Sequence, residues 1–192
     1  MRYSPEHKQE TRERIVHAAS RRFRKGGAGV GIGQLMKSLK LTHGGFYRHF
    51  DSKDDLVVAA LSAGFDETRS KLNTAIANAK PEHELEAIVT YYLSEQHCHD
   101  AASGCPVASL AAEVARQPHA VRAAFEKAMS SMAAIVSKYV RGATEEERRR
   151  KAGVLMTGMS GTLAVARALS DEQMRRNLLA TARATYIEAF AR

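Results

Sequence analysis

Apolar residues recur at helical spacing along most of the chain, and no stretch alternates apolar and polar positions as a half-buried strand would. In the first third this pattern predicts four short helices, over residues 11–25, 32–39, 42–50 and 52–65. Gly26 and Gly27 end the first of them, and the hydroxyls of Thr42 and Ser52 are placed to cap the third and fourth. The sequence therefore predicts short helices joined by tight turns.

Longer apolar segments occupy the rest of the chain and predict helices that include residues 85–92, 106–114, 118–141, 145–169 and 171–191. Prolines suit the first turn of a helix, and they stand at positions 81, 106 and 118. Two residue pairs match the capping-box pattern, Thr144 with Glu147 and Ser170 with Gln173. An all-α fold is predicted.

The positive charge lies in the N-terminal quarter of the chain. Residues 1–53 contain 12 Lys and Arg against 4 Asp and Glu, whereas the remaining residues contain 17 of each, so the formal net charge of +8 belongs to the first quarter. A local basic field is expected of a protein that binds a polyanion such as nucleic acid, although a solvated basic surface is the simpler alternative. An architectural DNA-binding protein would instead spread basic charge over a long surface.

Two cysteines, seven positions apart, are too few for the disulfide scaffold of a secreted protein. The charged N-terminal stretch lacks the apolar core of a signal peptide, and no apolar run approaches the ~20 residues of a membrane helix. We expect a cytoplasmic protein that does not enter a membrane.

Residues 32–50 read as a short helix, a tight turn and a second short helix, which is the arrangement of a helix-turn-helix. Phe46 and Phe50 lie four positions apart and should face inward, which directs the residues between them outward. Glycines at the start of the second helix would let its backbone approach DNA closely. The alternative is a buried helix pair with incidental surface residues.

Nine residues of this region are predicted to bind DNA. Tyr and His donate to phosphate oxygens, Arg holds a phosphate or a guanine in two-point geometry, and Lys at a helix N-terminus adds charge where an anion is already favoured. The set is Lys40, Thr42, His43, Gly44, Gly45, Tyr47, Arg48, His49 and Lys53.

The stretch IGQLMKSLKLTHGGFYRHFDSKDDL closely resembles the DNA-binding domain of the TetR (tetracycline repressor) family. The resemblance spans residues 11 to 65 and is carried by Thr42, Gly45, Phe46-Tyr47, His49-Phe50, Ser52-Lys53 and Leu56. It implies a three-helix helix-turn-helix domain over residues 8–68 and a larger helical domain over residues 69–192 that dimerises and encloses a ligand. Lys40 departs from the family, which usually has glycine at this turn position. We expect lysine there to adopt a less favourable backbone conformation and to add a phosphate contact.

The segment KAGVLMTGMSGTLAVARAL, residues 151–169, is apolar around most of its circumference, so it must be buried on more than one side. Gly158, Gly161 and Ala164 are small enough for another helix to approach. We predict a four-helix homodimer interface formed with the last helix; a monomer with a central helix is the alternative.

A small-molecule inducer, with no cofactor, is the ligand that the resemblance implies. Methionine and aromatic side chains adapt to irregular apolar ligands, although the same residues also fill ordinary cores. The predicted lining residues are Tyr91, Tyr92, Phe125, Met129, Met132, Met156 and Met159.

The stretch HCHDAASGCP, residues 97–106, holds both cysteines, and its spacing matches no common zinc site, so no metal is predicted. Pro106 at a first helical position would make Cys105 the N-cap, where the helix dipole lowers a thiol pKa. Cys98 or His99 would resolve or activate that thiol. Resemblance to TetR-type regulators that respond to electrophiles through one cysteine implies Cys105 and Cys98 as sensor thiols.

The leading prediction is a repressor that binds a palindromic operator as a dimer and is released by a small molecule. The alternatives are a thiol-based sensor that uses Cys105, or a cysteine-dependent enzyme. The chain lacks a Gly-rich phosphate loop, a serine elbow and paired acids at recognisable spacing, so we do not expect an enzyme.

Overall fold

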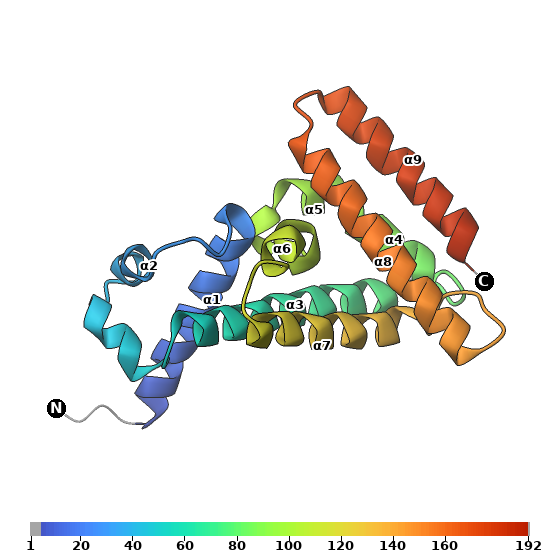
Figure 1. Ribbon diagram of the computed structural model, residues 1–192. Coiled ribbons are helices and arrows are strands. Elements are labelled where there is room, and N and C mark those ends of the chain that lie inside the picture. Colours follow the sequence, from blue (N-terminus) through green and yellow to red (C-terminus); the bar gives the residue numbers. More distant parts are fainter. Residues whose placement is uncertain (1–4, 192) are drawn as a thin grey trace.

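The computed structural model describes residues 5–191, and this part of the chain folds into helices without a β-strand (Figure 1). The elements are α1 (Pro5–Gly26), α2 (Ile32–Ser38), the 3-10 helix η1 (His43–Arg48), α3 (Lys53–Ala77), α4 (Glu84–Tyr92), α5 (Glu95–His99), the 3-10 helix η2 (Ala101–Ser103), α6 (Pro106–Val114), α7 (His119–Val136), α8 (Glu145–Ala168) and α9 (Glu172–Phe190). The predicted all-α fold is confirmed. Within residues 5–191 no helix is long and apolar enough to cross a membrane.

Helix caps that depend on one nearby side chain are mostly where the sequence places them. The hydroxyl of Thr42 accepts a hydrogen bond from the Gly45 N–H at 3.2 Å, and that of Ser52 accepts one from Asp55 at 3.1 Å. Thr144 likewise caps α8, accepting from the Glu147 N–H at 3.1 Å. These caps begin the elements that carry the two predicted functional surfaces.

Several local predictions are wrong. Helices α1 and α3 are longer than predicted, with 22 and 25 residues, and α7 ends at Val136, before the predicted end at residue 141. Asp171, not Ser170, caps α9, because its carboxylate reaches the Met174 N–H at 2.8 Å. Pro81 precedes α4 without entering its first turn, since Glu82 adopts a φ of 71° and breaks the helical path. The segment after Thr42 was predicted to be helical through residue 50, but it forms a 3-10 helix that ends at Arg48.

Two clusters of buried apolar side chains divide the molecule. One joins α1, α2, η1 and the first half of α3 with residues of α6 and α7, and the other joins the second half of α3 with α4 to α9. Because α3 runs unbroken from one cluster to the other, the boundary predicted between residues 68 and 69 stays a prediction. Figure 1 shows α2 and η1 at one end of the molecule and α8 with α9 at the other.

Helices α1, α3 and α6 meet closely where the two clusters join. A Cβ atom at Gly64 of α3 would come within 2.9 Å of the Pro106 ring and 3.0 Å of the Ser20 hydroxyl. Only glycine fits this crossing without a shift of its neighbours.

Candidate nucleic-acid interface

Helix η1 is anchored by one aromatic side chain and exposes the next. Phe46 has no exposed surface and stacks on Phe50 with 5.4 Å between ring centroids. Tyr47 is 60% exposed, and its ring meets that of Phe46 edge-on at 5.2 Å. The sequence prediction of an inward Phe46 and an outward Tyr47 is confirmed, and it gives η1 one buried face and one free face.

The turn between α2 and η1 has the strain that lysine at position 40 predicts. Lys40 adopts a φ of 59°, in the left-handed region that a side chain disfavours. The turn is closed by backbone bonds from Lys40 to Lys37 at 3.1 Å and from Leu41 to Met36 at 2.9 Å. The turn thus adopts left-handed geometry without glycine, and the exposed lysine adds a positive charge beside η1.

The nine predicted DNA-binding residues lie on this one region of the surface. Three of them, Gly45, His49 and Lys53, are half-buried, and the others are exposed. A Cβ at Gly44 would meet no atom within 4 Å. The packing of the chain therefore does not require glycine at this position, whereas a closely approaching partner would. The grouping matches the predicted interface, and the contact of each residue with DNA stays a prediction.

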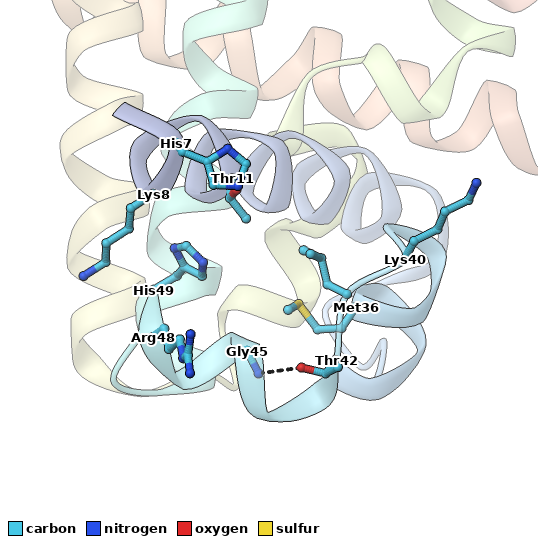
Figure 2. Close-up of a pocket in the computed structure, with 10 residues that line it drawn as sticks. His7, Lys8, Thr11, Met36, Lys40, Thr42, Gly45, Arg48 and His49 are labelled. Atoms are coloured by element: carbon cyan, nitrogen blue, oxygen red, sulfur yellow. Dashed lines mark hydrogen bonds between the residues drawn. The ribbon is translucent and has the colours of Figure 1, made fainter. Parts of the chain in front are cut away.

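A hollow of about 660 Å³ lies beside η1 and brings in residues of α1 that the sequence reading missed (Figure 2). It is lined by His7, Lys8, Thr11, Met36, Lys40, Leu41, Thr42, Gly45, Arg48 and His49. Figure 2 shows His7, Lys8 and Thr11 on α1 facing Arg48 and His49 across this space. Lys8 and Arg12 are four positions apart and share a helix face, a spacing that could have indicated a basic face on α1.

His49 is surrounded by positive charge. Burial, followed by the charges of Lys8, Arg12 and Arg48, lowers the pKa of its imidazole below the ordinary value. Arg12 is held close because its guanidinium lies over the Phe50 ring, 4.9 Å from the centroid. An anion entering the hollow would meet this concentration of cations.

A second exposed surface runs along α8 and α9. Besides Tyr47, the large apolar side chains that stand exposed among residues 5–191 are Val154 at 63%, Val165 at 55% and Met174 at 59%. Gly161 lies on the same surface, and a Cβ there would meet nothing within 4 Å. Ala164 is half-buried nearby in α8.

Gly158 has a different role from the one predicted. A Cβ at this position would lie 2.8 Å from the hydroxyl of Tyr186, so the glycine makes room for the chain's own α9. Tyr186 also bonds Thr162 of α8 at 3.1 Å. The apolar residues around the circumference of α8 predicted that the helix is covered on more than one side. They did not show which side faces α9.

The seven predicted ligand-lining residues are packed into the larger cluster. Tyr92, Met132, Met156 and Met159 are buried, whereas Tyr91, Phe125 and Met129 are half-buried around them. Four hollows found among residues 5–191 are lined by other residues. The inducer pocket therefore stays a prediction.

Cys105 is the N-cap of α6, with Pro106 in the first helical position, as predicted. Its thiol is nevertheless only 2% exposed, and burial raises its pKa above the usual range. The helix N–H groups of Val107 and Ala108 favour the thiolate, but burial outweighs them. The prediction of a lowered pKa is therefore wrong, because burial depends on the whole fold. Cys98 is also a buried free thiol with a raised pKa.

His97 locks the cysteine region in place. Its Nδ1–H donates to the Tyr92 carbonyl at 2.7 Å, and its Nε2 accepts the Cys105 N–H at 3.0 Å. This fixes the neutral ring, in agreement with burial lowering its pKa to about 4. His99 is exposed and bonds the Glu95 carbonyl. Within residues 5–191 no three His, Cys, Asp or Glu side chains gather as a metal site would require.

The cysteine loop, residues 97–105, is tied to three helices. From α1, Arg24 donates to the Gly104 carbonyl at 2.8 Å, and Arg21 bonds the Ser103 hydroxyl. From α3, Lys71 donates to the Ser103 carbonyl at 2.8 Å. From α8, Arg167 donates to the carbonyls of Cys98 and His97 at 3.0 and 2.9 Å. Two arginines of α1 thus hold the loop that carries Cys105.

Both halves of the chain match described protein families. The description "Bacterial regulatory proteins, tetR family" matches residues 15–60, and "Tetracyclin repressor-like, C-terminal domain" matches residues 81–182. The HTH-type transcriptional repressor NemR of Escherichia coli is 27% identical over 140 residues, which cover 71% of this chain and 70% of NemR. The HTH-type transcriptional regulator LmrA of Bacillus subtilis is 27% identical over 154 residues, or 78% of this chain and 82% of LmrA.

Solved structures share the fold over nearly the full length. A structure described as the reduced form of Escherichia coli NemR aligns with a TM-score of 0.75 and 23% identity, over 95% of this chain and 97% of that chain. A TetR transcriptional regulator from Chloroflexus aurantiacus aligns with a TM-score of 0.79 and 23% identity, over 97% and 100%. Since the C-terminal family match alone covers more than half of the chain, this protein belongs to the TetR family of bacterial transcriptional regulators.

Proposed function

We propose that the protein is a homodimeric repressor that binds a palindromic operator and leaves it when a small-molecule inducer binds the larger domain. It acts in the cytoplasm, where its DNA partner lies. The observation that carries the proposal is the free face of η1, with Tyr47 60% exposed on a buried Phe46 and with six of the nine predicted DNA contacts exposed around it. An exposed short helix in a basic field is suited to the major groove.

Selection of bound duplexes from a random DNA library tests this proposal. A repressor of this kind enriches one palindrome, whose half-sites are spaced by about one helical turn or a multiple of it. Binding to the selected duplex should exceed binding to a scrambled one at the same salt concentration. Equal affinity for both sequences would refute a sequence-specific repressor and favour a nonspecific DNA-binding protein.

The homodimer is proposed to form through α8 and α9. Three exposed apolar side chains, Val154, Val165 and Met174, lie on these two helices, and exposed clusters of this kind are typical of protein interfaces. Gly161 leaves space beside them for a helix of a second copy. A four-helix interface of two helices from each copy would cover the surface and set the spacing of the two η1 helices.

Replacing Gly161 with arginine is expected to give monomers at micromolar concentration, because it places a charge in the proposed interface. Operator affinity should fall about tenfold or more, since each half-site is then bound alone. Sedimentation velocity and fluorescence anisotropy measure the two effects. Ala123→Arg is the matched control, an exposed position on α7. A dimeric Gly161→Arg protein, or a monomeric wild type, would rule out this interface.

A thiol-based response is the second candidate function. It is favoured by the position of Cys105, which directly follows Gly104, the residue whose carbonyl Arg24 of α1 holds. A group added to the buried thiol would not fit the closed packing and would displace the loop from α1. The raised pKa of the thiol implies that reaction requires a transient opening of the loop.

We expect iodoacetamide to alkylate Cys105 slowly in the folded protein, because the thiol is buried, and the alkylated protein to lose operator affinity. Mass spectrometry and anisotropy measure the two steps. Cys98→Ser should still respond, whereas Cys105→Ser should not. If Cys105→Ser responds as the wild type does, Cys105 has only a structural role. Release by a noncovalent inducer is then the remaining candidate function.

A further inference from the structure

His97 is buried and His49 is half-buried, and they differ in whether both ring nitrogens have hydrogen-bond partners. Both ring nitrogens of His97 have hydrogen-bond partners, which fix it in the neutral state. In His49, Nδ1 is buried and has no hydrogen-bond partner among residues 5–191. This leaves Nε2 as the ring nitrogen available to a ligand, and the protonation state of His49 then depends on its neighbours and on what enters the hollow.

Three cationic side chains act on the charge of His49. Lys8 and Arg12 of α1 and Arg48 of η1 act directly on its charge, and His7 and Lys40 also line the space. No Asp or Glu is among the ten lining residues; Asp54 and Asp55 lie beyond them, in the first turn of α3. Protonation of His49 in the free protein therefore adds a positive charge beside three cations.

We propose that the hollow between α1 and η1 is a phosphate site, and that filling it adds one proton, carried by His49. The inference rests on the proposed DNA binding, and it adds α1 to the interface and a proton to the binding equilibrium. The ligand chemistry is a phosphate oxyanion, for which Lys8, Arg48 and the imidazolium of His49 supply charge-assisted hydrogen bonds.

The dimensions favour a nucleic-acid backbone as the source of the phosphate. A space of about 660 Å³ is far larger than one free ion and admits a phosphate together with its flanking sugars. It is lined by Gly45 and Arg48 of η1 as well as by residues of α1, so a strand bound to η1 at this hollow would pass its backbone along α1. Free phosphate has the same oxyanion but lacks the sugars that would fill the remaining space.

The direction of the pH effect follows from the charges. Burial and three cations lower the His49 pKa in the free protein, and a bound phosphate would offset those cations and raise it. The complex then holds more protons than the free protein, so affinity for DNA increases as the pH falls. The increase occurs between the lowered pKa of the free protein and the higher pKa of the complex, and it approaches about tenfold per pH unit for one proton.

Histidine ring resonances, followed by NMR as the pH is varied from about 8 to about 5.5, test the proposal in the full chain. The His49 titration is measured alone, with inorganic phosphate, and with a mixed-sequence duplex at low salt, because backbone contacts do not depend on sequence. We expect the duplex to raise the His49 pKa. If inorganic phosphate alone raises it, the site accepts free phosphate as well. An unchanged His49 pKa with both ligands would overturn the proposal.

Duplex affinity as a function of pH gives an independent measurement. His49→Gln should remove most of the pH dependence and Lys8→Gln should weaken binding, whereas the exposed His119→Gln on α7 should behave as the wild type. A pH dependence that survives in His49→Gln would also overturn the proposal. A wild type that binds no duplex at any pH would instead refute the proposed function, so the two failures are distinguishable.

Discussion

Replacing Phe46 with alanine is expected to abolish operator binding by unfolding the helix-turn-helix, whereas replacing the adjacent Tyr47 should weaken binding and leave the fold intact. Phe46 is fully buried and stacks on Phe50, so its loss removes a large core side chain and leaves a cavity. Such a change costs about 3–5 kcal/mol, which is a large part of the ~5–15 kcal/mol that stabilises a domain. Thermal unfolding followed by circular dichroism measures the loss.

Tyr47→Ala is the matched substitution on the exposed face. Since the ring is 60% exposed, the free energy of unfolding should change by about 0.5 kcal/mol or less. Loss of one phosphate contact should reduce operator affinity about tenfold without altering sequence preference. Tyr47→Phe separates the hydroxyl from the ring. If Tyr47→Ala unfolds as readily as Phe46→Ala, or binds the operator with unchanged affinity, the assignment of the two faces is wrong.

The features predicted correctly from the sequence are those decided within a few residues. Thr42 and Ser52 cap the elements that follow them because the N–H groups they bond lie three positions away. The left-handed φ of Lys40 follows from the tight turn that it must complete. Ser170 fails for an equally local reason, since the next residue, Asp171, takes the cap with a carboxylate.

The features that sequence reasoning missed depend on distant segments. The dipole argument for Cys105 was correct about the helix, yet other helices bury the thiol and raise its pKa. Gly158 meets Tyr186, a residue 28 positions away, which periodicity in α8 alone does not reveal. The basic hollow brings Lys8 of α1 beside Arg48 of η1, which is 40 positions away, so the local sequence did not indicate Lys8 as a candidate.

Arg24 is the largest omission of this kind, because nothing in its local sequence distinguishes it from the exposed arginines of α1. Its side chain is 1% exposed, and its Nη2 pairs with Glu67 of α3 at 2.6 Å. Its other donors reach the carbonyls of Gly104, at 2.8 Å, and Ser20, at 3.2 Å. One buried guanidinium therefore joins α1, α3 and the cysteine loop.

Removal of Arg24 is accordingly expected to be among the most destabilising single changes in the chain. Arg24→Ala leaves the buried Gly104 carbonyl and one Glu67 oxygen without their partner. A buried polar group left unpaired typically costs about 1–3 kcal/mol. Arg69→Ala is the matched control, because Arg69 pairs with Asp66 at the same 2.6 Å but in an exposed position. Its loss should cost about 1 kcal/mol or less. Urea unfolding of both variants measures the difference.

The response to acid provides a second measurement on the same pair. Burial alone would raise the pKa of Glu67, but hydrogen bonds from Lys71 and Arg24 outweigh it and lower the pKa. A depressed carboxyl pKa contributes stability that is fully present above about pH 4.5 and is lost as the pH falls through the folded-state value. Arg24→Ala should therefore lose less stability than the wild type on acidification. If Arg24→Ala loses as much stability on acidification as the wild type, Arg24 is not the residue that holds α1 to the cysteine loop. If Arg69→Ala is destabilised as much as Arg24→Ala at neutral pH, burial does not set the strength of the Arg24–Glu67 pair.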